Sequence, residues 1–286
     1  MIKKIFVLLS AIAFVSASYC QELPKSSPKS NVSQRVGLTD INVSYSRPSK
    51  KDREIFGSLV PNDIVWRAGA NEATLFRTSS DIIVGNEKLV KGTYSIFIVP
   101  SSSDEWKVIF NSDTTLRGTG NLKEENNVIT IPGAVSKTGS ITETLEFRFL
   151  NVTMSNTDLA LEWDSVRMTV SISADPTNQV KENIKLALKE AEKDEKWLVY
   201  RNAAAYARDT KMTDQGLEWI KQSIELNDTW YGEWVYAELL AQSNDMKTAT
   251  KAGLQAIDLG KVEYKEKPFP YESRIENAIN DWNAQK

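Results

Sequence analysis

The sequence predicts an α+β protein of two domains, an antiparallel β-sandwich over residues 34–174 and an α-helical domain over residues 175–286. Before residue 174, short runs rich in β-branched and aromatic residues follow one another, and several alternate apolar with polar residues. After it, apolar residues recur at helical spacing. A series of strands followed by a series of helices is typical of two separate domains.

Five runs carry the clearest strand pattern of the first domain. They are Ile41–Tyr45, Tyr94–Ile98, Trp106–Phe110, Leu145–Phe149 and Val166–Ile172. Turn-forming residues lie between them, at 85–86, 91–92, 100–101, 112–113 and 132–133. Because no helical pattern intervenes, we expect antiparallel strands in a sandwich or barrel. A domain of about 140 residues is long enough to bury one core.

The helical domain begins at Asp175 and Pro176. Asp is a favoured N-cap residue, and Pro suits the first position of a helix because its missing N–H would be unsatisfied there anyway. The apolar residues that follow keep the spacing of one helix face: Val180, Ile184, Ala187, Leu188 and Ala191. We therefore expect the first helix to start at this point.

A weak repeat with a period of 33 residues follows, in which Ala204, Gly216, Ser223, Ile224 and Leu226 recur as Ala237, Ala249, Ala256, Ile257 and Leu259. Small residues at these offsets let paired helices approach closely, and the stretch resembles tetratricopeptide repeats, whose period is about 34 residues. Two repeats make a marginal solenoid. We therefore expect this domain to depend also on its first helix, on a closing helix near residues 271–282, or on the sandwich.

Four aromatic residues cluster at the start of one predicted helix of the repeat: Trp230, Tyr231, Trp234 and Tyr236. Such residues are most often the core between helices. The alternative is a groove that holds an extended peptide or a glycan.

The first 20 residues have the order of an export signal. Lys3 and Lys4 form a charged start, residues 5–15 an apolar stretch, and residues 16–18 a small-residue cleavage zone. The apolar stretch is too short to cross a bilayer as a helix, which needs about 20 residues. We expect an exported protein, periplasmic or secreted, without a transmembrane span.

Two cleavage points fit this leader, after Ser18 or after Cys20, and the second leaves a mature chain without thiols. An alternative makes Cys20 a lipidated anchor, although the bulky Tyr19 before it fits that processing badly. Residues 21–33 are rich in Ser, Lys and Pro and have no apolar periodicity, so we interpret them as a flexible tether.

Composition excludes several kinds of chemistry. The 286 residues include no histidine and one cysteine, which excludes Ser-His-Asp and Cys-His catalysis and nearly all zinc sites. The sequence has no Asp-rich calcium loop, and we expect neither metal nor cofactor. Loss of Lys3 and Lys4 with the leader leaves 33 basic against 38 acidic residues, so nucleic acid and anionic membranes are poor partners.

One segment concentrates hydrogen-bonding side chains in an apolar setting. Trp66, Arg67, Asn71 and Glu72 lie within seven residues, around Gly69. Such density in a mostly apolar stretch indicates either a buried polar network or a ligand site.

The same segment carries a resemblance. The Trp-Arg-x-Gly-Ala-Asn-Glu core at 66–72, with Tyr-Ser-Arg-Pro at 45–48, Phe-Gly-Ser-Leu-Val-Pro at 56–61 and Gly-Thr-Tyr-Ser at 92–95, resembles the family known as domain of unknown function 2911. The resemblance covers residues 33–173. It implies an exported bacterial protein with no established activity.

A structural interpretation makes this segment part of the fold. Arg67 and Glu72 would pair beneath the glycine-containing loop, since buried charges are tolerated only when paired and hydrogen-bonded. Asn71 would bind backbone groups, and Trp66 would close the end of the sandwich. The small residues around Gly69 make the necessary turn easy.

A binding interpretation turns the same side chains outward. Arg67 and Asn71 would donate hydrogen bonds to an anionic or sugar ligand, and Trp66 would stack beneath it. Three residues close in sequence would complete the pocket: Tyr45, Arg47 and Arg53. In both interpretations we expect Arg67 and Glu72 to act as one unit.

The function that these patterns favour is a non-catalytic module in the cell envelope. Its partner would be a glycan, a peptide or another envelope protein. The alternative is a carboxylate-dependent hydrolase that acts on envelope glycan, with Glu72 as its acid or base.

Overall fold

The computed structural model describes residues 23–265 and 267–284. The predicted export signal at residues 1–20, with Cys20, lies outside the described residues. The chain divides into two compact units, between Asp175 and Pro176. Among the described residues, no helix combines the length and apolar character needed to cross a membrane.

The first unit is one antiparallel sheet of nine strands, which confirms the predicted antiparallel β structure. The strands are β1 (Lys29–Val36), β2 (Thr39–Ser46), β3 (Thr74–Thr78), β4 (Ile82–Val84), β5 (Glu87–Leu89), β6 (Gly92–Val99), β7 (Glu105–Asn111), β8 (Asn127–Leu150) and β9 (Asn156–Ser173). Their order in the sheet is β1-β2-β3-β6-β7-β8-β9-β4-β5. The five predicted runs lie in β2, β6, β7, β8 and β9.

The predicted tether is wrong over its second half, because residues 29–33 belong to β1. This strand pairs with β2 from Lys29 opposite Ser46 to Val36 opposite Thr39. Its burial alternates along the chain, but Ser, Asn, Gln, Lys and Arg occupy six of its eight positions, and apolar side chains stand only at Val32 and Val36. An edge strand of this composition has almost no apolar pattern to detect.

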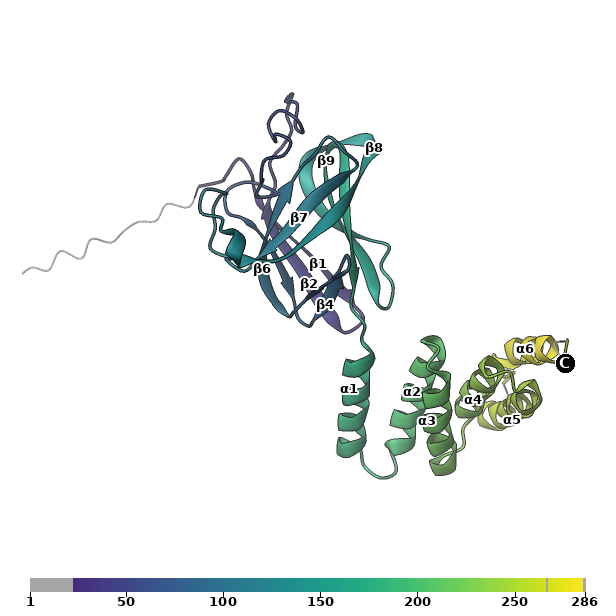
Figure 1. Cartoon of the computed structure of the whole chain (residues 1–286). Coiled ribbons are helices and arrows are strands. Elements are labelled where there is room, and N and C mark those ends of the chain that lie inside the picture. The colour runs from purple at the N-terminus through teal and green to yellow at the C-terminus, as the bar shows by residue number, and fades with distance from the viewer. Residues whose placement is uncertain (1–22, 266, 285–286) are drawn as a thin grey trace, which may run out of the picture. The chain divides into compact units, whose positions relative to one another are not determined.

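The sheet bends so that strands distant in its order face each other across one core (Figure 1). Tyr45 in β2 packs against Phe147 in β8, with ring centroids 4.9 Å apart. The Phe147 backbone N–H donates to the Tyr45 hydroxyl oxygen at 3.0 Å. Phe76 in β3 and Phe110 in β7 meet in the same interior, at 5.2 Å.

The long hairpin of β8 and β9 has an irregular centre. Its register shifts twice between Lys137 and Glu146, and Asp164 on the facing strand has a positive φ of 55°. Such irregularities bend a strand and change the direction of nearby side chains. Here the irregular stretch includes Trp163, whose indole N–H donates to the backbone carbonyl of Glu143 at 3.3 Å.

Residues 47–73 join β2 to β3 with almost no regular structure. Two isolated bridges attach this long loop to the sheet, Ser49 to Thr144 of β8 and Trp66 to Ile98 of β6. Long connections of this kind in a compact domain are usually functional.

The second unit is a six-helix domain. The helices are α1 (Thr177–Glu190), α2 (Lys196–Asp209), α3 (Thr213–Leu226), α4 (Trp230–Gln242), α5 (Met246–Tyr264) and α6 (Glu272–Ala284). The first begins at Thr177, one residue after the Pro176 start that the sequence predicts. The expected closing helix near residues 271–282 is α6.

The weak repeat falls on two helix pairs, α2 with α3 and α4 with α5. Its small residues are buried: Ala204, Ala237, Ala249, Ser223 and Ala256. A Cβ added at Gly216 would lie 3.1 Å from the Ala207 Cβ and 2.7 Å from a Leu239 methyl. The period of small residues therefore marks positions where helices touch.

The aromatic cluster of the second unit belongs to its core. Trp234 is buried and stacks on Trp282 of α6, with ring centroids 5.9 Å apart. Trp230 stacks on Tyr271 at 4.8 Å, and Tyr231 and Tyr236 are partly buried against the same cluster. These rings join α4 to α6 rather than forming an open groove.

Candidate functional site

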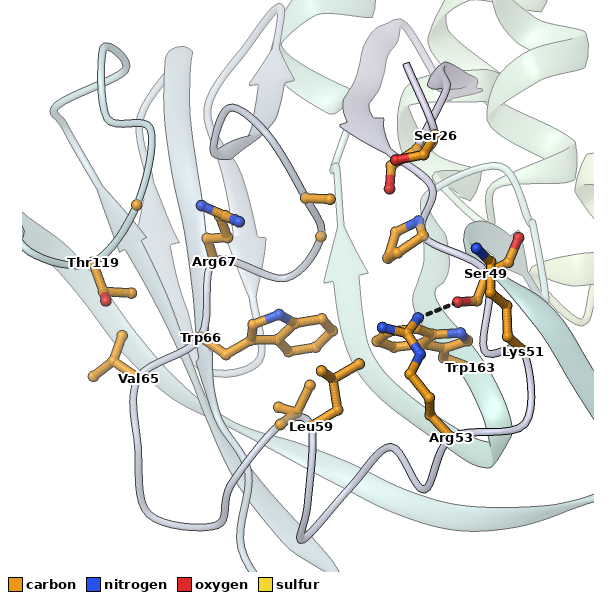
Figure 2. Close-up of a pocket in the computed structure, with 16 residues that line it drawn as sticks. Ser26, Ser49, Lys51, Arg53, Leu59, Val65, Trp66, Arg67, Thr119 and Trp163 are labelled. Carbon is orange, nitrogen blue, oxygen red and sulfur yellow. Dashed lines mark hydrogen bonds between the residues drawn. The ribbon is translucent and has the colours of Figure 1, made fainter. Parts of the chain in front are cut away.

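A pocket of about 740 Å³ opens beside the 47–73 loop (Figure 2). Most of its lining comes from that loop. The rest comes from Ser26 and Ser27 before β1, from Gly118 and Thr119 between β7 and β8, and from Trp163 of β9. The pocket therefore joins four segments that are far apart in the sequence.

Two indoles lie side by side along the pocket, Trp66 from the loop and Trp163 from β9 (Figure 2). Their ring centroids are 6.1 Å apart and their planes differ by 18°. Phe56 contacts both at steep angles, with centroids 6.1 Å from Trp66 and 6.3 Å from Trp163. Trp163 is only 2% exposed, whereas Trp66 is half-buried, so Trp66 offers more of its surface to a ligand.

The backbone holds Trp66 in this place. Its N–H donates to the Ile98 carbonyl at 2.7 Å, and the Ile98 N–H returns a bond to the Trp66 carbonyl at 2.8 Å. A reciprocal pair of this kind fixes one residue of the loop as if it were a short extra strand beside β6.

The turn after Arg67 uses two residues with left-handed backbone. Ala68 has a φ of 53° and is fully buried, and Asn71 has a φ of 60°. Asn tolerates this conformation, but for Ala it costs about 1 kcal/mol or more. Gly69 lies between them, where an added Cβ would be 3.1 Å from both the Ser46 carbonyl and the Thr74 hydroxyl. The Thr74 hydroxyl holds the turn by donating to the Ala68 carbonyl at 2.8 Å.

Both arginines of the pocket are held by carbonyl groups. Arg67 Nη1 donates to the Arg117 carbonyl at 2.7 Å. Arg53 Nε donates to the Lys50 carbonyl at 2.9 Å, and its Nη2 donates to the Ser49 carbonyl. Carbonyl acceptors fix the direction of a guanidinium without neutralising its charge.

The charged side chains that line the pocket are all cationic, and the Glu143 carboxylate accepts from the Lys51 backbone N–H at 2.8 Å. Lys51, Arg53 and Arg67 line the pocket, and none of its lining residues is Asp or Glu. Across the described parts of the chain, none of these three cations has a carboxylate within salt-bridge distance. Most other arginines of the sheet unit are paired with acids, including Arg35, Arg47 and Arg167.

The predicted pairing of Arg67 with Glu72 is wrong. Glu72 Oε1 instead accepts from Lys25 Nζ at 3.1 Å and from Arg117 Nη2 at 3.4 Å, outside the pocket. The turn at Ala68 and Asn71 sends the two side chains to different sides of the loop. A bond to its own backbone N–H and the hydrogen bond from Lys25 lower the pKa of the Glu72 carboxyl.

Asn71 and Glu72 hold the segment that precedes β1. Asn71 Nδ2 donates to the Ser27 carbonyl at 3.1 Å, and Glu72 binds Lys25. Ser26 and Ser27 then form part of the pocket wall. We call residues 25–28 the strap. The two predicted site residues thus act on the pocket by fixing one of its walls.

Two other predicted pocket residues support the fold instead. Tyr45 is buried in the core, and its hydroxyl accepts from Phe147 N–H. Arg47 binds β8, where Nε donates to the Leu145 carbonyl at 2.9 Å and Nη2 pairs with Glu146 at 3.1 Å. Neither residue lines the pocket. Of the predicted set, Arg53, Trp66 and Arg67 line it.

Sequence reasoning did not select Lys51 or Trp163. Lys51 lies two residues before Arg53, and the three basic residues within the four positions 50–53, interrupted by Asp52, were a visible signal. Trp163 lies about 100 residues further along the chain, in an alternating strand pattern. Nothing in that pattern distinguishes it from an ordinary core residue. Only the folded hairpin places it beside Trp66.

The arrangement suits binding of an anion beside a flat apolar surface. The described residues contain no cluster of three or more His, Cys, Asp or Glu able to hold a metal ion. Within the pocket no carboxylate is available as a proton acceptor, and the donors are guanidinium, ammonium and hydroxyl groups.

Comparison with known families gives one match. A family model described as "Protein of unknown function (DUF2911)" matches residues 27–172, just over half of the chain. Among curated proteins, none matches this sequence. The matched region contains the whole pocket except Ser26, and it begins within the strap.

Proposed function

This chain belongs to the DUF2911 family of proteins of unknown function, and we propose that its sheet unit is a non-catalytic module that binds an anionic small molecule. The ligand would occupy the pocket of the 47–73 loop. Lys51, Arg53 and Arg67 would form ion pairs with its negative charge.

One observation carries this proposal. Three cationic side chains line a pocket of about 740 Å³ that has no acidic lining residue. Like charges at one site repel each other, and a fold gains nothing from gathering them without a counter-ion. An arginine whose guanidinium is already fixed by carbonyl groups is prepared to bind a carboxylate or phosphate with little further loss of side-chain freedom.

The hydrolase alternative receives no support from the position of Glu72. This residue lies outside the pocket, and the lowered pKa of its carboxyl keeps it ionised near neutral pH, so it holds no proton to donate there. We therefore do not propose Glu72 as a catalytic acid.

We further propose that the protein works outside the cytoplasm, in the periplasm or as a secreted protein. The order of charged, apolar and small residues at positions 1–20 supports this. Phosphorylated metabolites of the cytoplasm would then be less available than anionic components of the envelope.

For the fold, we propose that the bent sheet packs its two halves as a β-sandwich. The contact of Tyr45 in β2 with Phe147 in β8 supports this, because the two strands are not neighbours in the sheet. We also propose that α2–α5 are related to tetratricopeptide repeats, since α2 and α4 start 34 residues apart (Lys196 and Trp230). Such a unit would bind a peptide or an envelope protein.

The proposal is tested by calorimetric titration of the mature protein with citrate and with inorganic phosphate at low ionic strength. We expect binding that weakens at least tenfold in Arg67→Gln and in Arg53→Gln. Arg35→Gln is the matched control, because it removes the same charge from an exposed pair with Asp40 outside the pocket. If neither anion binds, or if all three variants lose affinity equally, the proposal fails.

A further inference from the structure

We propose that the ligand of this pocket is an acidic oligosaccharide, with a sugar ring on Trp66 and carboxylates at Arg67 and at Arg53. The inference rests on the proposed anion-binding function and adds the class of ligand. Three features of the pocket support this class of ligand: the distribution of its charges, its apolar surface and the hydroxyl groups at its rim.

The cations occupy both ends of the pocket rather than one point. Figure 2 shows Arg67 beside Trp66, and Arg53 with Lys51 beside Trp163. Each arginine therefore lies beside a different indole, and the centroids of the two indoles are 6.1 Å apart. A nucleotide or a single metabolite with its charge at one end would use one arginine and leave the other unpaired. A chain of acidic sugars presents a carboxylate on each unit and can reach both.

The surface between the two ends is apolar and partly flat. Trp66 contributes an indole that is half-buried, and Leu59, Val60 and Val65 line the same region. The C–H face of a sugar ring packs on an indole, while its edge keeps hydroxyl groups free to bind polar partners. Inorganic anions have no apolar face, so this part of the pocket would contribute nothing to their binding.

The rim carries hydroxyl groups suited to a hydroxylated ligand. Ser26, Ser27 and Thr119 line the pocket, and two of them, Ser26 and Thr119, are exposed to solvent. A hydroxyl can both donate and accept, which matches the hydroxyl groups of a sugar.

The size of the pocket agrees with a ligand of more than one ring. Pockets of 300 to 1,000 Å³ hold ligands of drug-like size, and about 740 Å³ lies in the upper part of that range. The pocket is partly open to solvent, so a longer chain can continue beyond it.

The test is a calorimetric titration with uronic acid oligomers of one to four units, in galacturonate, mannuronate and hyaluronan-derived series. Neutral malto-oligosaccharides, adenosine monophosphate and inorganic phosphate serve as comparison ligands. We expect affinity to rise at least tenfold from the monomer to the longer oligomers in at least one acidic series. Neutral oligomers should bind at least tenfold more weakly.

Three variants separate the contributions. Arg53→Gln should remove the dependence of binding affinity on oligomer length. Without Arg53, a second carboxylate has no second arginine to bind. Trp66→Ala should weaken the affinity for oligosaccharides at least tenfold. It should change the affinity for phosphate by no more than about threefold. Trp197→Ala, in the helical unit, is the control for loss of an indole elsewhere and should change neither.

The outcomes separate this inference from the proposed function. If phosphate binds through Arg67 but no acidic oligomer binds more tightly than its monomer, the anion site stands and the oligosaccharide is rejected. If neutral and acidic oligomers bind equally, or adenosine monophosphate binds more tightly than every oligomer, the inference is also wrong. If no anion binds at all, both the proposed function and this inference are wrong.

Discussion

The indoles of Trp66 and Trp163 lie 6.1 Å apart with nearly parallel planes, although 96 positions separate the two residues in the chain. One comes from an irregular loop and the other from the irregular centre of the β8–β9 hairpin. Each therefore stands where the regular pattern of the sheet is interrupted. The pocket exists because these two interruptions meet.

We expect the two tryptophans to differ in what they contribute. Trp163→Ala should lower the free energy of unfolding of the sheet unit by about 3 to 5 kcal/mol, because it removes a large side chain that is only 2% exposed. Trp66→Ala should cost less, about 1 to 2 kcal/mol, since its side chain is half-buried. Hydrogen exchange of the slowest sheet amides measures both. Equal costs would show that Trp66 is a core residue rather than an available surface.

A double-mutant cycle tests the separation of Arg67 from Glu72. The variants are Arg67→Met, Glu72→Gln and the combination. Because Glu72 is an exposed residue paired with Lys25 and Arg117, its change should cost at most about 1 kcal/mol. Both residues bind Arg117, Arg67 through its backbone carbonyl and Glu72 through its exposed guanidinium, so we expect a small coupling energy, below about 1 kcal/mol. A coupling of several kcal/mol in thermal or urea unfolding would restore the direct pair that the sequence suggested.

Much of the sheet was predictable from the sequence, because apolar and polar residues alternate along a strand that is buried on one face. The runs in β2, β8 and β9 have this pattern, whereas the run in β6 is buried at every position and is recognised by its β-branched and aromatic residues. The edge strand β1 does not, since polar residues occupy its exposed positions and also two of its four less exposed positions, Ser30 and Gln34.

The candidate site was predictable only in part, for a geometric reason. Sequence reveals which residue types gather near Trp66, but the direction of each side chain depends on backbone angles within the loop. A positive φ at Ala68 and at Asn71 separates Arg67 from Glu72. Tyr45 is on a strand, where alternation turns it into the core.

The strap gives a third prediction. Asn71→Gly keeps a residue that accepts a φ of 60° but removes the amide that binds the Ser27 carbonyl. We expect a loss of stability of about 0.5 to 1.5 kcal/mol. Hydrogen exchange at residues 26–30 should become faster, and anion affinity should fall, because Ser26 and Ser27 line the pocket.

The control for the strap is Asn121→Gly, which removes an exposed amide from a neighbouring loop outside the main pocket. It should leave exchange at residues 26–30 unchanged. If Asn71→Gly also leaves that exchange unchanged, Asn71 does not hold the strap.

The helical unit carries one group with an unusual titration. Burial, and then the nearby Asp228, raise the pKa of the Glu233 carboxyl to about 7, and the side chain is 9% exposed. In the unfolded chain the carboxyl titrates near its ordinary value of 4.5. The folded state therefore binds more protons between these values, and the contribution of Glu233 to stability falls as pH rises from about 4.5 through about 7.

Glu233→Gln should remove this dependence. The variant and the wild type should unfold with similar free energy at pH 5, and at pH 8 the variant should be more stable by about 1 to 3 kcal/mol. Urea unfolding followed by the helical circular dichroism signal measures the difference. A difference that does not change between pH 5 and pH 8 would show that Glu233 keeps an ordinary pKa.

The most direct test of the central claim, that the pocket cations of the 47–73 loop bind an anion, is a nuclear magnetic resonance titration of the mature protein with citrate. We expect the indole N–H signal of Trp66 and the guanidinium N–H signals of Arg67 and Arg53 to shift together, with one dissociation constant, and to stop shifting at high salt. Shifts confined to Arg117, Lys123 or other exposed cations, with the signals of Trp66 and both pocket arginines unmoved, would contradict the account.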